Sequence, residues 1–193
     1  MSRPSPSSGK PPVAHTAIVG DVASMWSKLC WNVDQFRDIQ VSYPDEREPL
    51  AYAAIDACIA AASLKDWMRR ALPRAELGDA FNTEFAAAIP LQAMCEAIAN
   101  TAKHSSHSDG QWGGSVSLDW EEGDESAPEG YVLRYRGPDG QPAGVYDLAA
   151  NHFNQLLGDW WAFLLSRGLV TADQRTPAWM QRKLRRIFPP LIE

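Results

Sequence analysis

The chain has 193 residues, of which 45% are hydrophobic and 22% are charged, a length and composition that fit one globular domain with its own core. A formal net charge of -6 and a pI near 5.2 argue against general binding of polyanions and leave room only for a local basic patch. Cys30, Cys58 and Cys95 are odd in number and widely spaced. This spacing argues against a disulfide framework or a zinc knuckle and predicts buried free thiols.

The first dozen residues, MSRPSPSSGKPP, are rich in Pro and Ser and lack the apolar core of a signal peptide. We expect residues 1–16 to be a disordered tail and residues 17–193 to form a single helical domain. No run reaches the ~20 apolar residues that a membrane-spanning helix needs. We therefore expect a cytoplasmic protein that makes no contact with a membrane.

Apolar residues at helical spacing predict four main helices. The first follows Asp21, a residue type that favours the N-cap position. The second is rich in alanine, and its small side chains let a neighbouring helix approach closely. The last ends at Gly168, the predicted C-cap. The four helices are expected to begin at Val22, Leu50, Pro90 and Leu148, and to end before Val41, at about Leu72, around Ser105–Ser108 and at about Ser166.

The connections between these helices differ in kind. Between the second and third, only one helical turn is predicted, through Phe81 and Phe85. Between the third and fourth, apolar and polar residues alternate around 116–120 and 131–135, which predicts short strands, and 143–146 is a candidate for a third. We therefore expect a mainly α fold: a four-helix bundle with a small antiparallel β-insert over about 112–146, followed by a basic C-terminal helix.

Polar residues gather where the third helix ends. Asn100, Lys103 and His104 lie within about one turn of each other. A plain helix end explains Lys103 and His104, because cations are favourable near a helix C-terminus. It does not explain Asn100, since asparagine is a poor residue inside a helix and needs hydrogen-bond partners when buried. Asp66, near the end of the second helix, is a candidate partner if the two helices are antiparallel neighbours.

These residue types suit metal-free RNA cleavage, which needs a base, an acid and a cation for the developing phosphorane charge. His104 is a candidate for either proton-transfer role because imidazole titrates near neutral pH. Lys103 is the candidate cation, and Asn100 would orient the phosphate. One helical turn carries too few catalytic groups for this reaction, but a homodimer that brings two such turns together would supply twice the number. No cofactor and no metal are expected.

The second helix contains AIDACIAAASLKDWMRRAL and the third contains AMCEAIANTAKH, and this pair of segments resembles the HEPN-like proteins of bacteria and archaea. These are small helical bundles common in toxin–antitoxin and phage-defence systems. The resemblance covers roughly residues 45–168 and implies a dimeric RNA-binding or RNA-cleaving protein with its site at the end of the third helix. The matching positions are Asp66, Trp67, Pro90, Ala99, Asn100, Lys103, His104 and the pair Trp160 and Trp161.

One position departs from the family. Catalytic members carry an arginine where this chain has Ala99, and lysine lacks the bidentate fork with which arginine grips phosphate. The retained residues Asn100, Lys103 and His104 favour a protein that binds RNA or a nucleotide and cleaves RNA through a degenerate site. The missing arginine favours the alternative, a non-catalytic interaction module such as an adaptor, an antitoxin-like partner or a phage-derived inhibitor.

Other candidate sites are weaker. The C-terminal helix carries Arg182, Lys183, Arg185 and Arg186, which would bind phosphate backbones, or form a solvated face, or pack against the acidic loop at 121–129. His104, His107 and Asp109 are too few and too close to a helix end for a metal site. Trp112, placed among glycines, is the tryptophan most expected to be exposed for base stacking.

Overall fold

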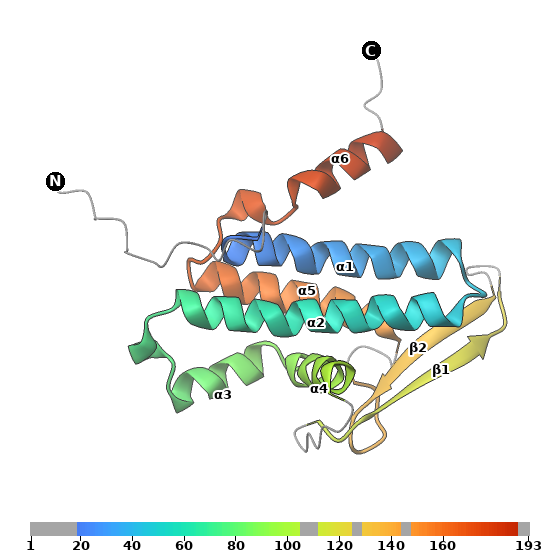
Figure 1. Cartoon of the computed structure of the whole chain (residues 1–193), viewed down its shortest axis with the longest axis horizontal. Coiled ribbons are helices and arrows are strands. Elements are labelled where there is room, and N and C mark those ends of the chain that lie inside the picture. The colour runs from blue at the N-terminus through green and yellow to red at the C-terminus, as the bar shows by residue number, and fades with distance from the viewer. Residues whose placement is uncertain (1–18, 105–111, 125–128, 144–147, 189–193) are drawn as a thin grey trace, which may run out of the picture.

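The computed structural model describes residues 19–104, 112–124, 129–143 and 148–188. Within these ranges the chain is mainly helical, with a small antiparallel hairpin between the fourth and fifth helices, which confirms the coarse fold that the sequence predicts (Figure 1). The predicted tail, residues 1–16, lies outside the described residues. The helices are α1 (Val22–Ser42), α2 (Arg47–Ala71), α3 (Asp79–Ala88), α4 (Gln92–Lys103), α5 (Ala149–Ser166) and α6 (Ala178–Ile187), and the strands are β1 (Ser115–Glu121) and β2 (Gly130–Arg136).

The long helices α1 and α2 form the most extensive helix–helix contact of the described fold. The predicted N-cap of α1 is confirmed, because the Asp21 carboxylate accepts a hydrogen bond from the backbone N–H of Ser24 at 2.8 Å and the Ser24 hydroxyl accepts one from the N–H of Asp21 at 3.0 Å. Along α2, Ala57 and Ala61 are fully buried. These small side chains let the neighbouring helices approach closely.

The connection after α2 is more helical than the sequence predicts. In place of a single turn, a ten-residue helix, α3, is present. Phe81 and Phe85, one turn apart on α3, both lie against Phe163 of α5, and Phe85 also meets the Trp160 ring with 5.4 Å between the ring centroids. This aromatic packing stabilises a segment whose own sequence gives only a weak helical pattern.

Helix α4 crosses α2 instead of running antiparallel to it. In Figure 1 α4 is seen nearly end-on, whereas α2 lies across the page. Pro90 belongs to the turn before α4 and not to its first turn, and His104 is the C-cap residue. The crossing carries the last turn of α4 toward the hairpin. The predicted end of this helix, Ser105–Ser108, lies outside the described residues.

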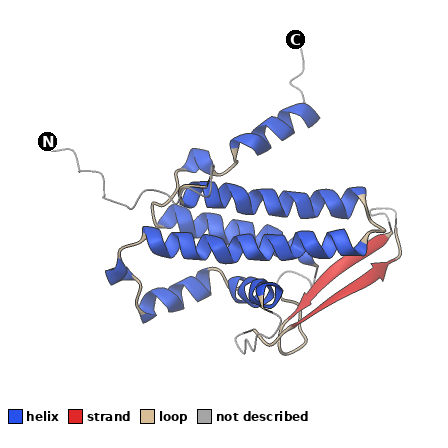
Figure 2. Ribbon diagram, in the orientation of Figure 1, coloured by secondary structure: helices blue, strands red, loops and turns tan. Residues whose placement is uncertain are grey.

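The hairpin pairs β1 with β2 and places Leu118 opposite Leu133. Figure 2 shows that β1 runs toward the end of the bundle where α1 is joined to α2 and that β2 returns from it. The N–H of Tyr131, near the start of β2, donates to the carbonyl of Pro44 there at 2.8 Å. Leu133 and Tyr135 of β2 are buried. Around the predicted third strand at 143–146, two isolated antiparallel bridges lie beside β2, between Arg136 and Pro142 and between Arg134 and Leu148. The Ala143 N–H donates to the Tyr135 carbonyl at 2.9 Å, and residues 144–147 lie outside the described chain.

Two smaller predictions concern the cysteines, for which the prediction is confirmed, and the end of α5. All three cysteines are free and buried, and burial raises the pKa of the Cys30 thiol to about 12. The C-cap of α5 is Arg167, one residue before the predicted Gly168, and Gly168 follows it with a φ of 64°, a conformation that glycine adopts without strain. No helix in the described part of the chain is long and apolar enough to cross a membrane.

Candidate functional site

The end of α4 presents the three polar residues that the sequence singles out. Asn100 is half-buried, and Lys103 and His104 are exposed. The backbone N–H of His104 donates to the Asn100 carbonyl at 2.9 Å, which closes the last helical turn. Lys103 lies in that turn, where a cation offsets the partial negative charge of the helix end. The fold therefore brings these three residues together at one surface.

Asp66 does not join them. Its side chain is exposed on α2, and no hydrogen bond links it to Asn100 in the described structure. Where α4 crosses α2, the neighbouring Lys65 makes the ion pair between the two helices. Its ammonium lies 2.7 Å from the Glu96 carboxylate, one turn before Asn100. The pairing expected for antiparallel helices is thus not formed.

A pocket of about 430 Å³ opens beside the last turns of α4. Alanines of α2 and α4 make it roomy, since a methyl group leaves space that a larger side chain would fill. Its aromatic surfaces come from Trp112 and Tyr135 of the hairpin region, and the lining is otherwise mostly apolar. This size and lining suit a small planar ligand or a nucleobase.

Glycines around Trp112 shape one wall of this pocket. A Cβ on Gly114 would lie 2.4 Å from the Trp112 indole ring and 2.3 Å from the Arg136 carbonyl oxygen, so no other residue fits there without movement. Gly113 has a φ of 61°, which also favours glycine. Trp112 is half-buried and does not stand free in solvent. The glycines thus let the Trp112 indole pack against the backbone at Gly114, where the indole forms a wall of the pocket.

The pocket and the polar triplet occupy different sides of α4. Ala97, Ile98, Thr101 and Ala102 line the pocket. At about 3.6 residues per turn, Asn100 and Lys103 point away from that side. His104, at the end of the helix, lies between the two surfaces. A ligand that touches both must therefore cross the end of α4.

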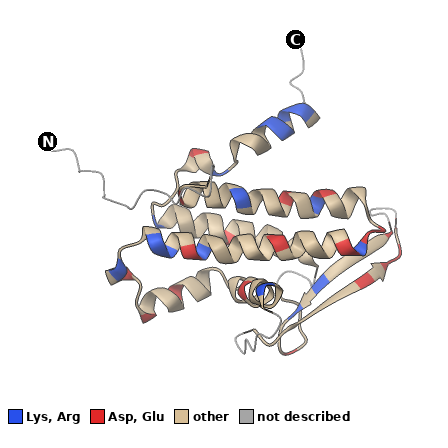
Figure 3. Ribbon diagram, in the orientation of Figure 1, with Lys and Arg blue, Asp and Glu red and all other residues tan. Residues whose placement is uncertain are grey.

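The basic helix α6 is on another part of the molecule. It lies against α1, beyond the side on which α4 packs, and its basic residues stand out in Figure 3. Lys183 binds two carboxylates of α1, with its ammonium 2.9 Å from Asp34 and 2.7 Å from Asp38. Lys183, which the sequence places among the candidate phosphate-binding residues, therefore forms ion pairs within the protein. Its acidic partners are on α1 and not in the loop at 121–129. The exposed arginines of α6 are Arg182, Arg185 and Arg186.

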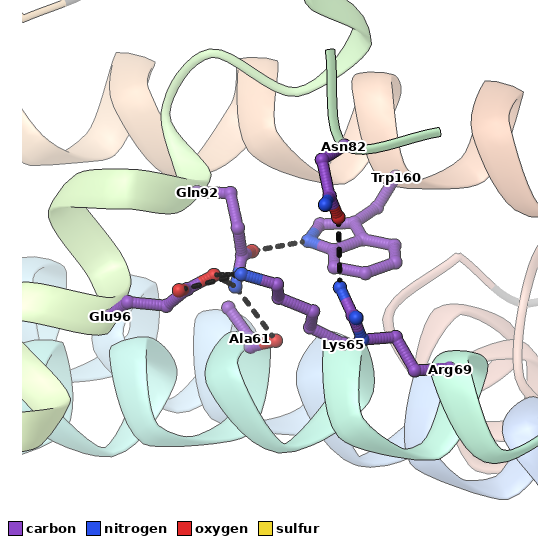
Figure 4. A network of polar contacts seen from close by, with 7 residues as sticks. All are labelled: Ala61, Lys65, Arg69, Asn82, Gln92, Glu96 and Trp160. Atoms are coloured by element: carbon purple, nitrogen blue, oxygen red, sulfur yellow. Dashed lines mark hydrogen bonds and ion pairs between the residues drawn. The ribbon is translucent and has the colours of Figure 1, made fainter. Parts of the chain in front are cut away.

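A buried polar network at the other end of α4 was not predicted. Gln92 is only 2% exposed, and its amide accepts a hydrogen bond from the Trp160 indole N–H at 2.9 Å (Figure 4). The same amide donates to Glu96 at 2.9 Å and to the Ala61 carbonyl at 3.3 Å. Lys65 completes the network through Glu96 and lies over the Phe85 ring. Because every group is paired, this network stabilises the crossing of α4 over α2 and is not a free catalytic site.

The sequence does contain a signal for this network. Gln92 lies three and seven residues before Cys95 and Ala99, so it shares their buried side of the helix. A glutamine on such a side needs a buried partner. The sequence cannot say which partner it is, because Trp160 is 68 residues away.

His152 on α5 is the buried imidazole of the described chain. It is 1% exposed, and its Nδ1–H donates to the Ala143 carbonyl at 2.7 Å. Its Nε2 has no hydrogen-bond partner. Burial lowers the pKa of His152 to about 4, against the opposing effect of the bond to Ala143. It is therefore a structural, neutral histidine near pH 7.

We expect His152 to make folding sensitive to acid. Because its pKa in the folded state is about 4, below the ordinary value near ~6.5, the unfolded chain takes up a proton first and stability falls between these two values. The loss attributable to this residue is about 3 kcal/mol. Urea unfolding at neutral and at acid pH measures it, with His152→Gln as the comparison. The variant should lose correspondingly less stability on acidification, and parallel losses in the two proteins would contradict this role.

The described residues contain no group of three or more His, Cys, Asp or Glu side chains placed to hold a metal ion, and His107 and Asp109 lie outside them. Comparison with known proteins identifies no relative of this chain. No protein-family model matches the chain, and neither a curated protein nor a solved structure is significantly similar to it. The resemblance to HEPN-like proteins thus depends on the sequence motifs alone.

Proposed function

We propose that this protein binds single-stranded RNA across the exposed end of α4. One nucleobase would enter the pocket beside Trp112, and Lys103 would contact a phosphate of a neighbouring nucleotide. The observation that carries the proposal is an aromatic-walled pocket of about 430 Å³ beside the last turns of α4, the helix whose end exposes Lys103 and His104. Aromatic stacking combined with a nearby cation is the usual chemistry of single-strand recognition.

The geometry suits a strand better than a mononucleotide. Lys103 and the pocket lie on different sides of a helix whose diameter with side chains is about 10–12 Å. A single nucleotide held in the pocket would leave its phosphate short of Lys103, whereas a strand crossing the helix end reaches both. His104 lies between them, and an imidazole can donate or accept a hydrogen bond.

RNA cleavage needs more catalytic groups than the described part of a single chain supplies. A metal-free mechanism needs both a base and an acid. At this end of α4 the described residues supply one imidazole, that of His104, and Ala99 stands where HEPN-like nucleases have an arginine. We therefore propose RNA binding as the function, in a bacterial cytoplasmic toxin, mobile-element or defence setting that the motif resemblance suggests. Cleavage would require a second set of groups from another copy.

We expect Lys103→Ala to weaken binding of a fluorescein-labelled single-stranded RNA by about three- to tenfold and to reduce the salt dependence by about 0.7 in the log–log slope, as removal of one phosphate contact should. Fluorescence anisotropy at several salt concentrations gives both numbers. Lys28→Ala is the matched control, because Lys28 is an exposed lysine on α1, away from α4. Equal affinities for the two variants would contradict the assignment.

Catalysis is tested on the same proteins. Purified wild type and His104→Ala are incubated with transfer RNA, and the products are separated on a denaturing gel. Equal and negligible cleavage by both agrees with a binding protein. Cleavage by the wild type that His104→Ala abolishes would establish a ribonuclease and extend the proposal.

A protein-interaction role is the second candidate, and a different observation favours it. The last turn of α6 exposes apolar side chains, with Ile187 56% and Phe188 73% accessible. Apolar groups exposed together in this way are typical of a surface that another protein covers. Such a role does not exclude RNA binding, since the two surfaces are separate.

A further inference from the structure

Strand β1 is the outer strand of the hairpin. Strand β2 lies between β1 and the helices, and β1 and β2 make up the whole sheet in the described part of the chain (Figure 1). Apart from the ladder with β2, no backbone hydrogen bond among the described residues reaches β1. An open sheet edge of this kind presents N–H and C=O groups that another strand can pair with.

The bonds of β2 show which way its backbone groups point. The N–H of Tyr131 donates to the Pro44 carbonyl, and the carbonyl of Tyr135 accepts from the Ala143 N–H. Neither partner belongs to β1. Because backbone direction alternates along a strand, the odd-numbered residues of β2 point away from β1 and the even-numbered residues form the ladder with it.

The register then identifies the outward groups of β1. The even-numbered residues of β2 lie opposite the odd-numbered residues of β1, as in the pair of Arg134 with Ser117. The backbone groups of these odd-numbered residues are therefore used within the hairpin. The N–H and C=O groups of Val116, Leu118 and Trp120 point instead to the open edge.

The side chains of the same three residues form an apolar row. They lie opposite Tyr135, Leu133 and Tyr131, so they share the side of the sheet that faces the bundle. Leu133 and Tyr135 are buried, whereas Val116 and Trp120 are 47% and 44% exposed. The apolar side of the sheet thus continues beyond the bundle and along the open edge.

The sequence of β1, SVSLDWE, has the same pattern of apolar and polar residues in both directions from Leu118. Two antiparallel copies related by a two-fold axis at Leu118 therefore match. Leu118 lies opposite the partner's Leu118, and Val116 lies opposite the partner's Trp120. This register joins the outward-pointing residues in three pairs, and each pair exchanges two hydrogen bonds. It also places apolar side chains against apolar ones along the whole strand.

Charge favours the antiparallel arrangement. Asp119 and Glu121 lie toward one end of β1 and pair with Arg134 of their own hairpin, whose Nε is 3.4 Å from the Asp119 carboxylate. In the antiparallel register they lie opposite the partner's Ser117 and the partner's Ser115, which are small and uncharged. A parallel pair in register would place each acidic residue opposite its own copy, and like charges directly opposite are destabilising.

From the open edge and its self-complementary pattern we infer that β1 binds β1 of a second copy of this chain. The two hairpins then form a four-stranded antiparallel sheet with two-fold symmetry. This dimer goes beyond the RNA-binding proposal and does not depend on it. Of the residues of β1, only Val116 lines the pocket beside Trp112. Variants of Leu118 therefore test the dimer and leave the residues of the proposed RNA site in place.

The test is the molar mass of the full chain over a wide range of concentration, measured by sedimentation equilibrium. We expect the wild type to be a dimer that dissociates on dilution, because one pair of short strands is a small interface. Leu118→Lys and Leu118→Glu should each raise the dissociation constant at least about tenfold, because each places two like charges opposite each other at the axis. Leu165→Lys, on α5 and 42% exposed, is the matched control and should remain dimeric.

A mixing experiment locates the two-fold axis. In an equimolar mixture of Leu118→Lys and Leu118→Glu, opposite charges meet at the axis. A heterodimer should therefore form at concentrations at which neither variant alone associates. A wild type that stays monomeric at every concentration would overturn the proposal, and so would a mixture that associates no more than its components. A dimer that Ile187→Asp dissociates and Leu118→Lys does not would assign the contact to α6 and equally overturn it.

Discussion

Replacement of Gln92 by leucine is expected to lower the free energy of unfolding by about 2–4 kcal/mol, although leucine is apolar and of similar size. The reason is the set of groups that the glutamine satisfies. Without its amide, the buried Trp160 indole N–H loses its partner, the Ala61 carbonyl loses the bond that it accepts in addition to its place in α2, and Glu96 loses a donor. Urea unfolding followed by circular dichroism measures the change.

A double-mutant cycle shows whether the pairing, rather than packing, is responsible. Trp160→Phe removes the indole N–H, and Gln92→Leu with Trp160→Phe removes both partners. The double variant should be more stable than the sum of the two single losses predicts, with a coupling of at least about 1 kcal/mol. Asn82→Ala is the control, since the bond from Arg69 to Asn82 is exposed at the edge of the same network (Figure 4) and should cost under about 0.5 kcal/mol. Strict additivity would refute the proposed pairing.

Trp112→Ala should weaken binding of single-stranded RNA by about 5- to 150-fold, which corresponds to the roughly 1–3 kcal/mol that one stacked base contributes. The indole is a wall of the pocket, so its loss removes the stacking surface and widens the cavity. Anisotropy titrations with a labelled oligonucleotide give the ratio of affinities. A near-normal far-ultraviolet spectrum and unfolding midpoint would show that the variant is folded.

Trp120→Ala is the matched variant for this experiment. Trp120 is also a tryptophan of the hairpin, 44% exposed, but it packs against Tyr131 and does not line the pocket. Its replacement should leave RNA affinity within about twofold of wild type, because no stacked base is lost. Equal losses in both variants would point to a general effect on the hairpin and against a base-binding pocket.

The sequence predicts most of the helices well because the features that determine them are local. Apolar spacing and an N-cap at Asp21 depend on a few neighbouring residues, and so α1, α2 and α5 appear close to where they are expected. The sequence predicts only one turn of helix α3, because the helix is stabilised by the packing of Phe81 and Phe85 against α5. The crossing of α4 over α2 also depends on distant contacts, above all on Gln92 and its partner Trp160.

The same distinction applies to the candidate site. The cluster of Asn100, Lys103 and His104 follows from helical spacing alone and is present at the end of α4. The pocket beside it needs alanines from two helices and an indole from the hairpin, which no single stretch of sequence brings together. The sequence does not show that Lys183 pairs within the protein, because its acidic partners lie on α1, 145 and 149 residues earlier in the chain.

Photo-cross-linking tests the central claim most directly. An oligonucleotide containing 4-thiouridine is bound to wild type and irradiated, and the attached peptides are identified by mass spectrometry. Binding across the end of α4 predicts that the cross-links map to the peptides that carry Trp112 and the last turn of α4, and that excess unlabelled RNA removes them. Cross-links confined to α6 or to the face formed by α1 and α2 would contradict an RNA site at the end of α4.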